Sequence, residues 1–380
     1  MSDVVRVAAA ALLAALCAVV VRKQVPELAI LLAVCGGGLI LLYCSGALEA
    51  TVELLDRLAD LAQEVRADLV LLSGDLLDSS QTYQETVEAL SRTLGQIQAP
   101  VFIAPGNHDC YGPRSVYANT AWPDNVHIFS TVSVESVALP ELGCTVHGAA
   151  FTTPQADRSP LMGFTAPRDG QVHLMALHGD VDGKGRYGPI DPADIAASGL
   201  TYLALGHIHA CSGLQKAGNT WWAYPGCPEG RGFDETGDKG VLVVTVGDDP
   251  SDVTARFVPL AGRRYEIVEA DVTGADTAAQ ALEEVLPAEP CGDCCRILLT
   301  GQRSFGPPDL AVLTAQAQPY YYSVTIRDHT RQLRDLWERA GEDSLTGLVL
   351  RQLKAQGGPE AELAARFALA ALENGEDPCP

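Results

Sequence analysis

The chain has 380 residues, of which 47% are hydrophobic and 19% are charged. This composition excludes an intrinsically disordered protein, and the length allows two or three separately packed domains. The 26 Lys and Arg against 48 Asp and Glu give a net charge of −22, which excludes a protein that holds nucleic acid through a uniformly basic surface. A phosphate-bearing ligand must therefore meet a local basic patch or bound metal cations.

The first part of the chain contains two uncharged apolar runs, Val7–Val21 and Leu28–Leu48, separated by a short basic turn. The second run matches the ~20 residues that cross a bilayer as a helix. The first run is shorter, but Arg6 at its end can reach the membrane interface. We expect residues 1–48 to form a two-helix transmembrane hairpin. A signal peptide is the alternative, but no small-residue cleavage site precedes the basic turn.

Residues 49–66 carry leucines at helical spacing with charges on the other side, which predicts an amphipathic connecting helix. Together with the apolar runs, this stretch resembles the N-terminal half of the stage III sporulation protein AD family of endospore-forming bacteria. The resemblance covers about residues 1–62 and is carried by VVVRKQVPELAILLAVCGGGLILLY at residues 19–43. It implies a membrane component of sporulation assembly.

Two further patterns follow along the chain. Residues 67–262 alternate short apolar runs with helical stretches, which is typical of an α/β domain. Residues 263–380 begin with two short strands on either side of a helix near Thr277–Leu286, followed by a further strand and helical segments. This second pattern predicts a separate small α+β domain.

Four apolar runs of residues 67–262 end in polar clusters. The clusters are GDLLD at 74–78, GNHD at 106–109, HGD at 178–180 and GHIH at 206–209. Short apolar runs bounded by turn residues predict buried strands, and functional groups of α/β sheets gather beyond the carboxyl ends of such strands. We therefore expect one edge of a sheet to bring the four clusters together.

The residue types in these clusters indicate a metal centre. Carboxylate, amide and imidazole ligands suit Mn, Fe, Zn or Mg better than a soft thiolate-binding metal. Two such ions about 3.5–4 Å apart can activate a hydroxide and hold the attacked phosphorus, and a nearby histidine can protonate the leaving oxygen. Each cluster alone is typical of an ordinary turn, whereas the four in this order favour a metal site.

These motifs resemble the calcineurin-like metallophosphoesterase superfamily and, within it, the DNA-repair exonuclease branch of the SbcCD type. The resemblance covers about residues 66–355, and it includes YPGCPEGRGFDE at 224–235 and DSLTGLVL at 343–350. It implies an α/β fold, a β-sandwich flanked by helices, with a small α+β capping domain at 263–380. It also implies one or two divalent ions, manganese first among them, a DNA or other phosphodiester substrate, a homodimer and an SbcC-like ATPase partner.

The resemblance assigns roles to individual residues. The implied metal ligands are Asp75, Asn107, His178, His207 and His209. Asp75 would bridge two ions, His209 would serve the first ion, and the other three would complete the second. His108 would be the non-ligating acid or phosphate contact, with Asp109 orienting it. Arg231 would meet substrate phosphate, and a structural ion pair is the alternative.

One part of the family pattern is missing. The family begins with a strand ending in Asp-x-His, which supplies two ligands of the first ion, and no Asp-x-His precedes Asp75 in this chain. We therefore expect weakened hydrolysis. The abrupt change near residues 62–66 leaves two explanations open: a genuine fusion with a degenerate first metal site, or an artificial joining of two reading frames.

Three functions remain open from the sequence. The leading one is metal-dependent phosphodiester hydrolysis resembling a DNA-repair exonuclease. The acidic net charge favours a phosphatase that acts on nucleotides or phosphoproteins instead. The third is a non-catalytic membrane component related to sporulation. The expected location is at the membrane, with the phosphoesterase part in the cytoplasm.

Overall fold

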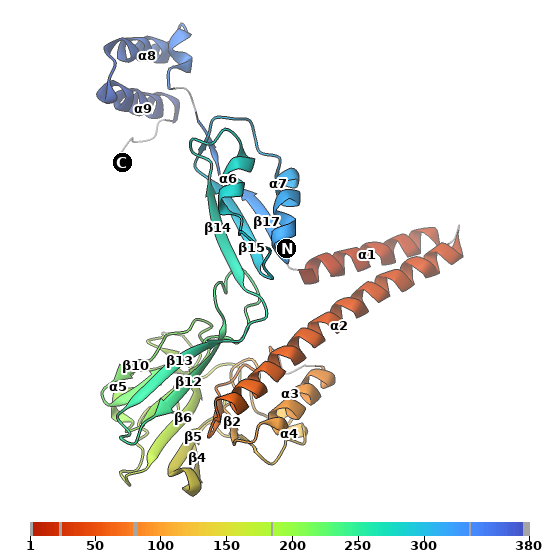
Figure 1. The fold of residues 1–380 in the computed structure, drawn as a ribbon, viewed down its shortest axis with the longest axis vertical. Helices are drawn as coiled ribbons and strands as arrows, with labels where there is room; N and C mark the ends of the chain where they lie inside the picture. Colours follow the sequence, from red (N-terminus) through yellow and green to blue (C-terminus); the bar gives the residue numbers. More distant parts are fainter. Residues whose placement is uncertain (1–2, 23–24, 79–82, 184, 334–335, 375–380) are drawn as a thin grey trace. The chain divides into compact units, whose positions relative to one another are not determined.

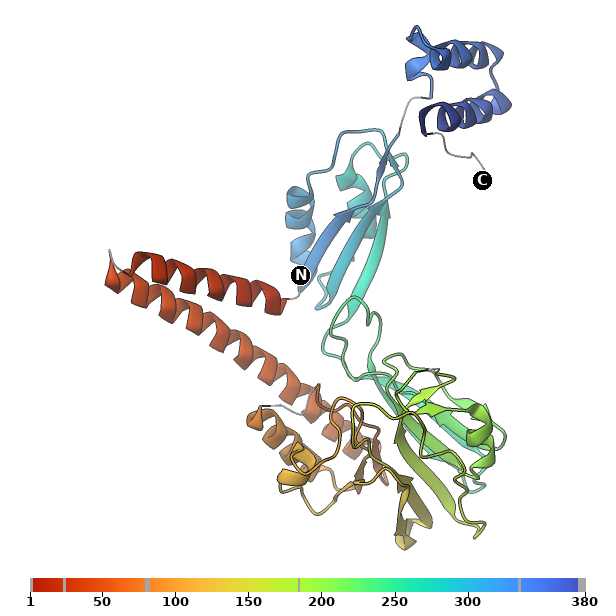
Figure 2. The ribbon, with the colours of Figure 1, turned by 180° about the vertical axis from the view of Figure 1, so that it is seen from behind.

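The strand ends that carry the polar clusters belong to the first of two units into which the chain divides, Met1–Glu266 and Ile267–Pro380. The structure is a computed structural model, shown from opposite sides in Figures 1 and 2. It describes residues 3–22, 25–78, 83–183, 185–333 and 336–374. The division lies close to the change of pattern expected between residues 262 and 263.

The first unit contains helices and short strands in alternation along much of its length. Its helical elements are α1 Asp3–Val21, α2 Pro26–Glu64, α3 Gln84–Gln96, α4 Val116–Asn119, the 3-10 helix η1 Pro140–Leu142 and α5 Pro192–Ala197. Its strands are β1 Val70–Leu72, β2 Val101–Ile103, β3 Val126–Ile128, β4 Glu135–Leu139, β5 Cys144–Gly148, β6 Val172–His178, β7 Asp180–Val181, β8 Pro189–Ile190, β9 Tyr202–Gly206, β10 Gln215–Ala217, β11 Thr220–Ala223, β12 Gly240–Val246 and β13 Val253–Pro259.

A three-stranded parallel sheet, in the order β1-β2-β3, forms one layer of this unit. Strand β1 is apolar on both sides because both faces of the sheet are covered. Val70 and Leu72 pack toward α2 and α3, whereas Leu69 and Leu71 pack toward the second sheet. The strand therefore appears in the sequence as a continuous apolar run that leads directly into the GDLLD cluster.

The second layer is a six-stranded mixed sheet in the order β10-β11-β9-β6-β5-β4. Its central strands β5, β6 and β9 run parallel, so that β6 and β9 end at the same edge with His178 paired to Gly206. One face packs against the first sheet through Phe102 and Ala176, and the other is covered by α5 through Ile195. The predicted mixed α/β class is thus confirmed.

The N-terminal apolar runs form two helices packed on each other. Figure 1 shows α1 folded back along the first part of α2, and small residues make the contact possible. Ala11, Ala18 and Ala29 are buried, and a Cβ atom on Gly36 would lie 3.2 Å from the Cβ of Ala14. The expected boundary between an apolar helix and a connecting helix at residues 48–49 is absent, because α2 continues through it without interruption.

The final turns of α2 belong to the core of the sandwich. Ala59 is buried there, with Leu55 and Ala62 packed around it against the first sheet and α3. Within the described residues, no helix combines the length and the apolar character needed to cross a membrane. The predicted transmembrane hairpin at residues 1–48 is therefore not supported.

The second unit continues from strand β14, which starts just before the division. Its strands are β14 Tyr265–Asp271, β15 Cys294–Thr300, β16 Gln302–Arg303, β17 Ser323–Asp328 and β18 Arg331–Gln332. Its helical elements are α6 Ala278–Val285, α7 Leu310–Ala317, the 3-10 helices η2 Gln318–Tyr320 and η3 Glu338–Gly341, α8 Leu345–Gln356 and α9 Pro359–Asn374. The sheet β14-β15-β17 packs against α6 and α7, and α8 packs against α9 around Leu350 and Ala365. This arrangement matches the α+β pattern expected from the sequence, although η3 replaces a helix expected near Gln332–Ala340.

Candidate metal centre

The loops after β1 and β2 approach each other so closely that only glycine fits at one contact. A Cβ atom on Gly106 would lie 2.2 Å from the Oδ1 atom of Asp75, which no real side chain tolerates. Asp75 itself has a φ of 52°, in the left-handed region that aspartate occupies more readily than most residues. The local backbone therefore points this carboxylate toward the ends of the neighbouring strands.

Asp109 holds the two loops together. Its carboxylate is buried and accepts hydrogen bonds from two backbone N–H groups through Oδ1, those of Gly106 at 2.7 Å and Asp75 at 3.1 Å. Its Oδ2 atom accepts from the N–H of Leu76 at 2.8 Å and the hydroxyl of Tyr117 at 2.6 Å. Burial and the neighbouring Asp109 raise the pKa of Tyr117 well above its usual value. Asp109 is thus an anchor for the loop that carries Asp75.

The side chain of His108 lies apart from that anchor. Its ring Nδ1 atom is 3.3 Å from the carbonyl oxygen of Asp78, and its backbone N–H donates to the Oδ1 atom of Asp75 at 2.9 Å. Among the described residues, the hydrogen bonds of Asp109 do not include the His108 ring. The role expected for Asp109 in orienting His108 therefore has no direct contact behind it, while His108 remains exposed beside Asp75.

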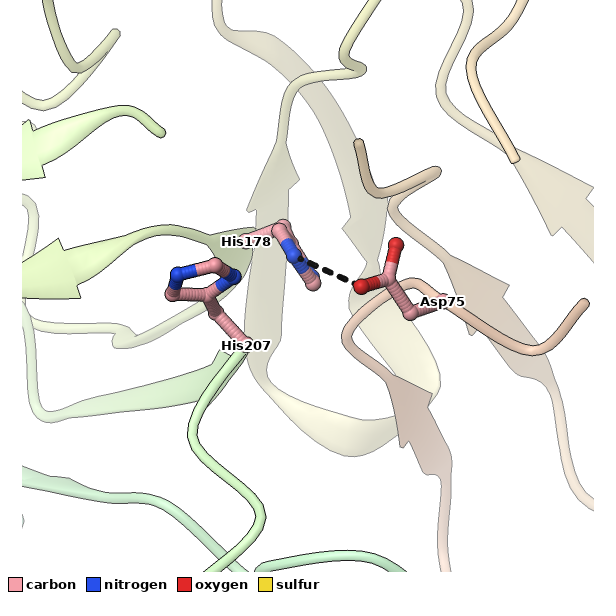
Figure 3. Close-up of side chains that lie close together, drawn as sticks. All are labelled: Asp75, His178 and His207. Carbon is pink, nitrogen blue, oxygen red and sulfur yellow. Dashed lines mark ion pairs between the residues drawn. The ribbon is translucent and has the colours of Figure 1, made fainter. Parts of the chain in front are cut away.

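His178, at the end of β6, provides the clearest geometry of the site. Its Nδ1 atom lies 2.8 Å from the carbonyl oxygen of Ser73. Because a carbonyl only accepts, Nδ1 carries a proton, and Nε2 is the ring nitrogen that faces the neighbouring side chains. This Nε2 atom is 2.9 Å from Asn107 Oδ1 and 3.2 Å from Asp75 Oδ2, the contact drawn dashed in Figure 3. Three atoms that can ligate a cation therefore converge on one point.

His207 completes the cluster from the end of β9. Its ring meets that of His178 edge to face with centroids 5.2 Å apart, and its φ of 105° is unusual for a residue with a side chain. Ligand atoms of Asp75, His178 and His207 all lie within 4.8 Å of one another, as Figure 3 illustrates. The ring of Tyr187 packs against that of His207, with the two ring centroids 5.3 Å apart. No sequence motif indicated this neighbour.

The electrostatics favour the protonation states that bind metal. Burial raises the pKa of Asp75, but the hydrogen bond and charge of His178 and the N–H of His108 outweigh it and leave the pKa below its usual value. Burial and the nearby His178 lower the pKa of His207. An ionised carboxylate and neutral imidazoles are the forms that ligate a cation. With the amide oxygen of Asn107, they form a donor set that fits a divalent ion of the Mn, Fe, Zn or Mg kind.

The structure places His209 in a different group. Its Nδ1 atom contacts Glu235 Oε1, and ligand atoms of His209, Cys227 and Glu235 lie within 4.8 Å of one another. Neither Cys227 nor Glu235 was expected to ligate a metal, although both stand in the segment YPGCPEGRGFDE. The elements that precede β1 in the described chain are α1 and α2, so the missing Asp-x-His strand has no counterpart there.

Arg231 forms an ion pair with Asp78. The two side chains are 58% and 75% exposed, so solvent screens the attraction and the pair contributes little to stability. Since Asp78 also meets the His108 ring, the pair lies beside the exposed histidine. The structure thus shows the ion pair that was the alternative for Arg231, and a phosphate contact stays a prediction.

The arrangement of strand-end ligands agrees with a comparison to known families. The sequence profile described as "Calcineurin-like phosphoesterase" matches residues 20–211. The chain belongs to this family. The match begins well inside the stretch that resembled a sporulation protein, so α2 falls within the phosphoesterase match. The sporulation origin expected for residues 1–62 is therefore not supported.

Two relatives are similar over much of the chain. The "Uncharacterized metallophosphoesterase YhaO" of Bacillus subtilis (strain 168) is 28% identical over 268 residues, which cover 67% of this chain and 64% of that protein. A nuclease subunit of SbcCD from Staphylococcus epidermidis (strain ATCC 12228 / FDA PCI 1200) is 22% identical over 246 residues, 55% of this chain and 63% of that protein. The chain thus spans less than two thirds of the length of these relatives. A family that binds divalent metals fits the donor set described above.

Proposed function

We propose that this phosphoesterase hydrolyses phosphodiester bonds with a divalent ion held by Asp75, Asn107, His178 and His207. The observation that carries the proposal is the convergence at His178: its Nδ1 atom is engaged by Ser73, and its Nε2 atom faces one oxygen each of Asp75 and Asn107. Lone pairs of three acceptors facing one another repel unless a cation or a proton lies among them. Membership of the family supports the cation.

The residues around this set have distinct tasks in the reaction. A bound divalent ion supplies Lewis acidity to a phosphoryl oxygen and lowers the pKa of an attacking water. His108 is exposed beside Asp75 and is the group we propose to protonate the leaving oxygen. Arg231 can exchange its exposed partner Asp78 for a substrate phosphate. Asp109 keeps the two ligand-bearing loops in register.

We propose DNA as the substrate and exonuclease action as the reaction, because the Staphylococcus epidermidis relative is named as a nuclease subunit. That name also motivates a larger partner subunit, an ATPase of the SbcC type. Since the chain lacks the Asp-x-His pair, we propose activity through the single donor set around Asp75, weaker than that of a two-ion enzyme. Manganese is the ion we propose to test first, because oxygen and imidazole donors suit it.

A second candidate substrate class follows from charge. The net charge of −22 opposes a long polyanion unless a basic patch receives it, whereas a nucleotide or another small phosphate ester needs only the site itself. Comparing turnover of a short DNA duplex with turnover of nucleotides separates the two.

The proposal is tested with the purified full chain, Mn²⁺ and a chromogenic phosphodiester. We expect Asp75→Asn to lower turnover by more than about 100-fold, since the loss of a direct ligand exceeds the 10–100-fold effect of a lost supporting partner. The matched control is Asp248→Asn, an exposed carboxylate remote in sequence from the four clusters, which should leave turnover unchanged. Equal turnover of the wild type and Asp75→Asn would overturn the proposal.

A further inference from the structure

A second group of side chains that could ligate a metal includes His209, which follows His207 of the first group by two residues. His209, Cys227 and Glu235 come from the loop after β9 and from the irregular segment after β11, and their ligand atoms lie within 4.8 Å of one another. The Glu235 side chain is 10% exposed and that of His209 is 41% exposed, which leaves an open side. The group is therefore partly enclosed and reachable by a cation from solvent.

We propose that Cys227, His209 and Glu235 form a second metal site, separate from the Asp75 set, that takes a thiophilic divalent cation such as Zn²⁺. A thiolate, an imidazole and a carboxylate supply three of the four positions of a tetrahedral zinc ion, and water fills the fourth. Bonds of the usual length place such ligand atoms about 3.3–3.8 Å apart. The observed spread needs only small side-chain movements to reach this geometry, including separation of the His209 Nδ1 and Glu235 Oε1 atoms.

Neighbouring groups hold the three side chains in place. The backbone N–H of Cys227 donates to the carbonyl oxygen of His209 at 3.4 Å, which ties the two loops together. The Oε2 atom of Glu235 accepts from the N–H of Arg231 at 2.7 Å, which leaves Oε1 for His209 or a cation. Such supporting hydrogen bonds are characteristic of ligands fixed before the metal arrives.

Local charge also permits a cation. The ammonium group of the buried Lys239 donates to the His209 carbonyl at 3.1 Å, so the group includes one positive charge beside the negative charge of Glu235. A bound divalent ion stabilises the thiolate form of Cys227, which adds a second negative charge to that of Glu235. A hydrogen-bonded group without metal is the competing explanation, and it predicts no sulfur–metal contact.

The thiol distinguishes this site from the Asp75 set, whose donors are oxygen and nitrogen. The full chain is loaded with Co²⁺ as a spectroscopic substitute for Zn²⁺, and its near-ultraviolet thiolate-to-cobalt charge-transfer band is recorded. We expect the band in the wild type, its loss in Cys227→Ser, and its retention in Cys211→Ser, a matched change at an exposed cysteine. Asp75→Asn should also retain the band. The result is therefore readable even if the proposed hydrolysis fails.

A second measurement needs no variant. The wild-type chain is alkylated with iodoacetamide with and without Zn²⁺, and each cysteine is followed by peptide mapping. Zn²⁺ should lower the rate at which Cys227 is alkylated by more than about tenfold, because a thiolate bound to a metal is protected from the reagent. The alkylation rate of Cys211 should not change. Absence of a charge-transfer band in the wild type, its persistence in Cys227→Ser, or equal alkylation with and without Zn²⁺ would overturn the proposal.

Discussion

His207 and His209 leave the end of the same strand with only Ile208 between them, yet they belong to groups of different chemistry. His207 joins Asp75 and His178, a set of oxygen and nitrogen donors, whereas His209 joins Cys227 and Glu235. The GHIH motif determines which strand end both histidines occupy. Their partners come from other segments, and those partners determine what each group can bind.

The two groups also differ in enclosure. The His178 side chain is fully buried and that of Asp75 is 16% exposed, whereas that of His209 is 41% exposed. Ligands in the enclosed group are fixed by backbone atoms such as the Ser73 carbonyl, which favours one geometry. The open group is more accessible to solvent, so we expect it to bind metal in faster exchange.

The largest expected effect separates the two groups directly. His178→Ala should lower phosphodiester turnover by more than about 100-fold because it removes a ligand, whereas His209→Ala should cost less than the roughly 10–100-fold of a supporting partner. The turnover of each variant is measured with Mn²⁺, and the Mn²⁺ affinity of each variant is measured by calorimetry. Equal losses would show that both histidines serve one centre, and the distinction between the groups would be lost.

Asp109→Ala should lower the metal affinity of the enclosed group, although Asp109 is not one of its ligands. The substitution leaves buried N–H groups and the Tyr117 hydroxyl without their acceptor, which we expect to lower the free energy of unfolding by about 3 kcal/mol. Mn²⁺ affinity should fall about 10–100-fold as the loops separate. Asp109→Asn keeps the size of the side chain and one acceptor oxygen, so it should lower the free energy of unfolding and the Mn²⁺ affinity by less. An unchanged Mn²⁺ affinity in a folded Asp109→Ala protein would contradict the anchoring role.

A buried histidine pair outside both groups offers a contrast in pH response. The Nε2 atom of His147 lies 3.0 Å from the Nδ1 atom of His173, and the pair is capped by Ser136 at 2.8 Å and Asp169 at 3.0 Å. Burial, followed by the charge of His173, lowers the pKa of His147 from 6.5 to about 4. The unfolded chain therefore takes up this proton first as the pH falls.

Stability from His147 is consequently full above about pH 6.5 and is lost as the pH falls toward 4, by roughly 3 kcal/mol over that interval. Urea unfolding of His147→Gln should show a flatter dependence between these values, with or without Mn²⁺. The exposed His329 supplies the matched change His329→Gln, which should preserve the wild-type slope. A wild-type slope in His147→Gln would refute this assignment.

The smallest expected effect concerns Arg231. Because its ion pair with Asp78 is exposed, Arg231→Ala should change the free energy of unfolding by about 0–1 kcal/mol. If Arg231 contacts substrate phosphate, KM should rise several-fold with kcat little changed, and Arg231→Lys should restore part of the loss. A large loss of kcat would instead place Arg231 among the reacting groups.

The sequence predicted the enclosed group because its members follow apolar runs in short, local motifs. Parallel strands bring such strand ends to one edge, which predicted that the four clusters meet. The family resemblance then indicated Asp75, Asn107, His178 and His207 as ligands, together with His209. The partners of His209 follow it by many residues in an irregular segment, where spacing carries no periodic signal. Asp109 was assigned to chemistry because it stands in GNHD, yet its carboxylate serves backbone N–H groups that no sequence pattern displays.

The N-terminal helices show a different reason for failure. Their apolar runs were compared with the thickness of a bilayer, but within the described residues no helix has both the length and the apolar character of a membrane span. The leucines of residues 49–66 have helical spacing and predicted an amphipathic connecting helix. This pattern does not indicate that Ala59 and its neighbours on α2 pack into the sandwich. Long-range packing of this kind depends on the folded chain, and a single sequence does not reveal it.

The most direct test of the proposed metal centre is anomalous diffraction at the manganese edge from crystals of the full chain soaked in Mn²⁺. We predict a peak bounded by Asp75 Oδ2, Asn107 Oδ1, His178 Nε2 and a ring nitrogen of His207. A well-ordered site in which these four side chains surround no anomalous peak at saturating Mn²⁺ would contradict the central claim.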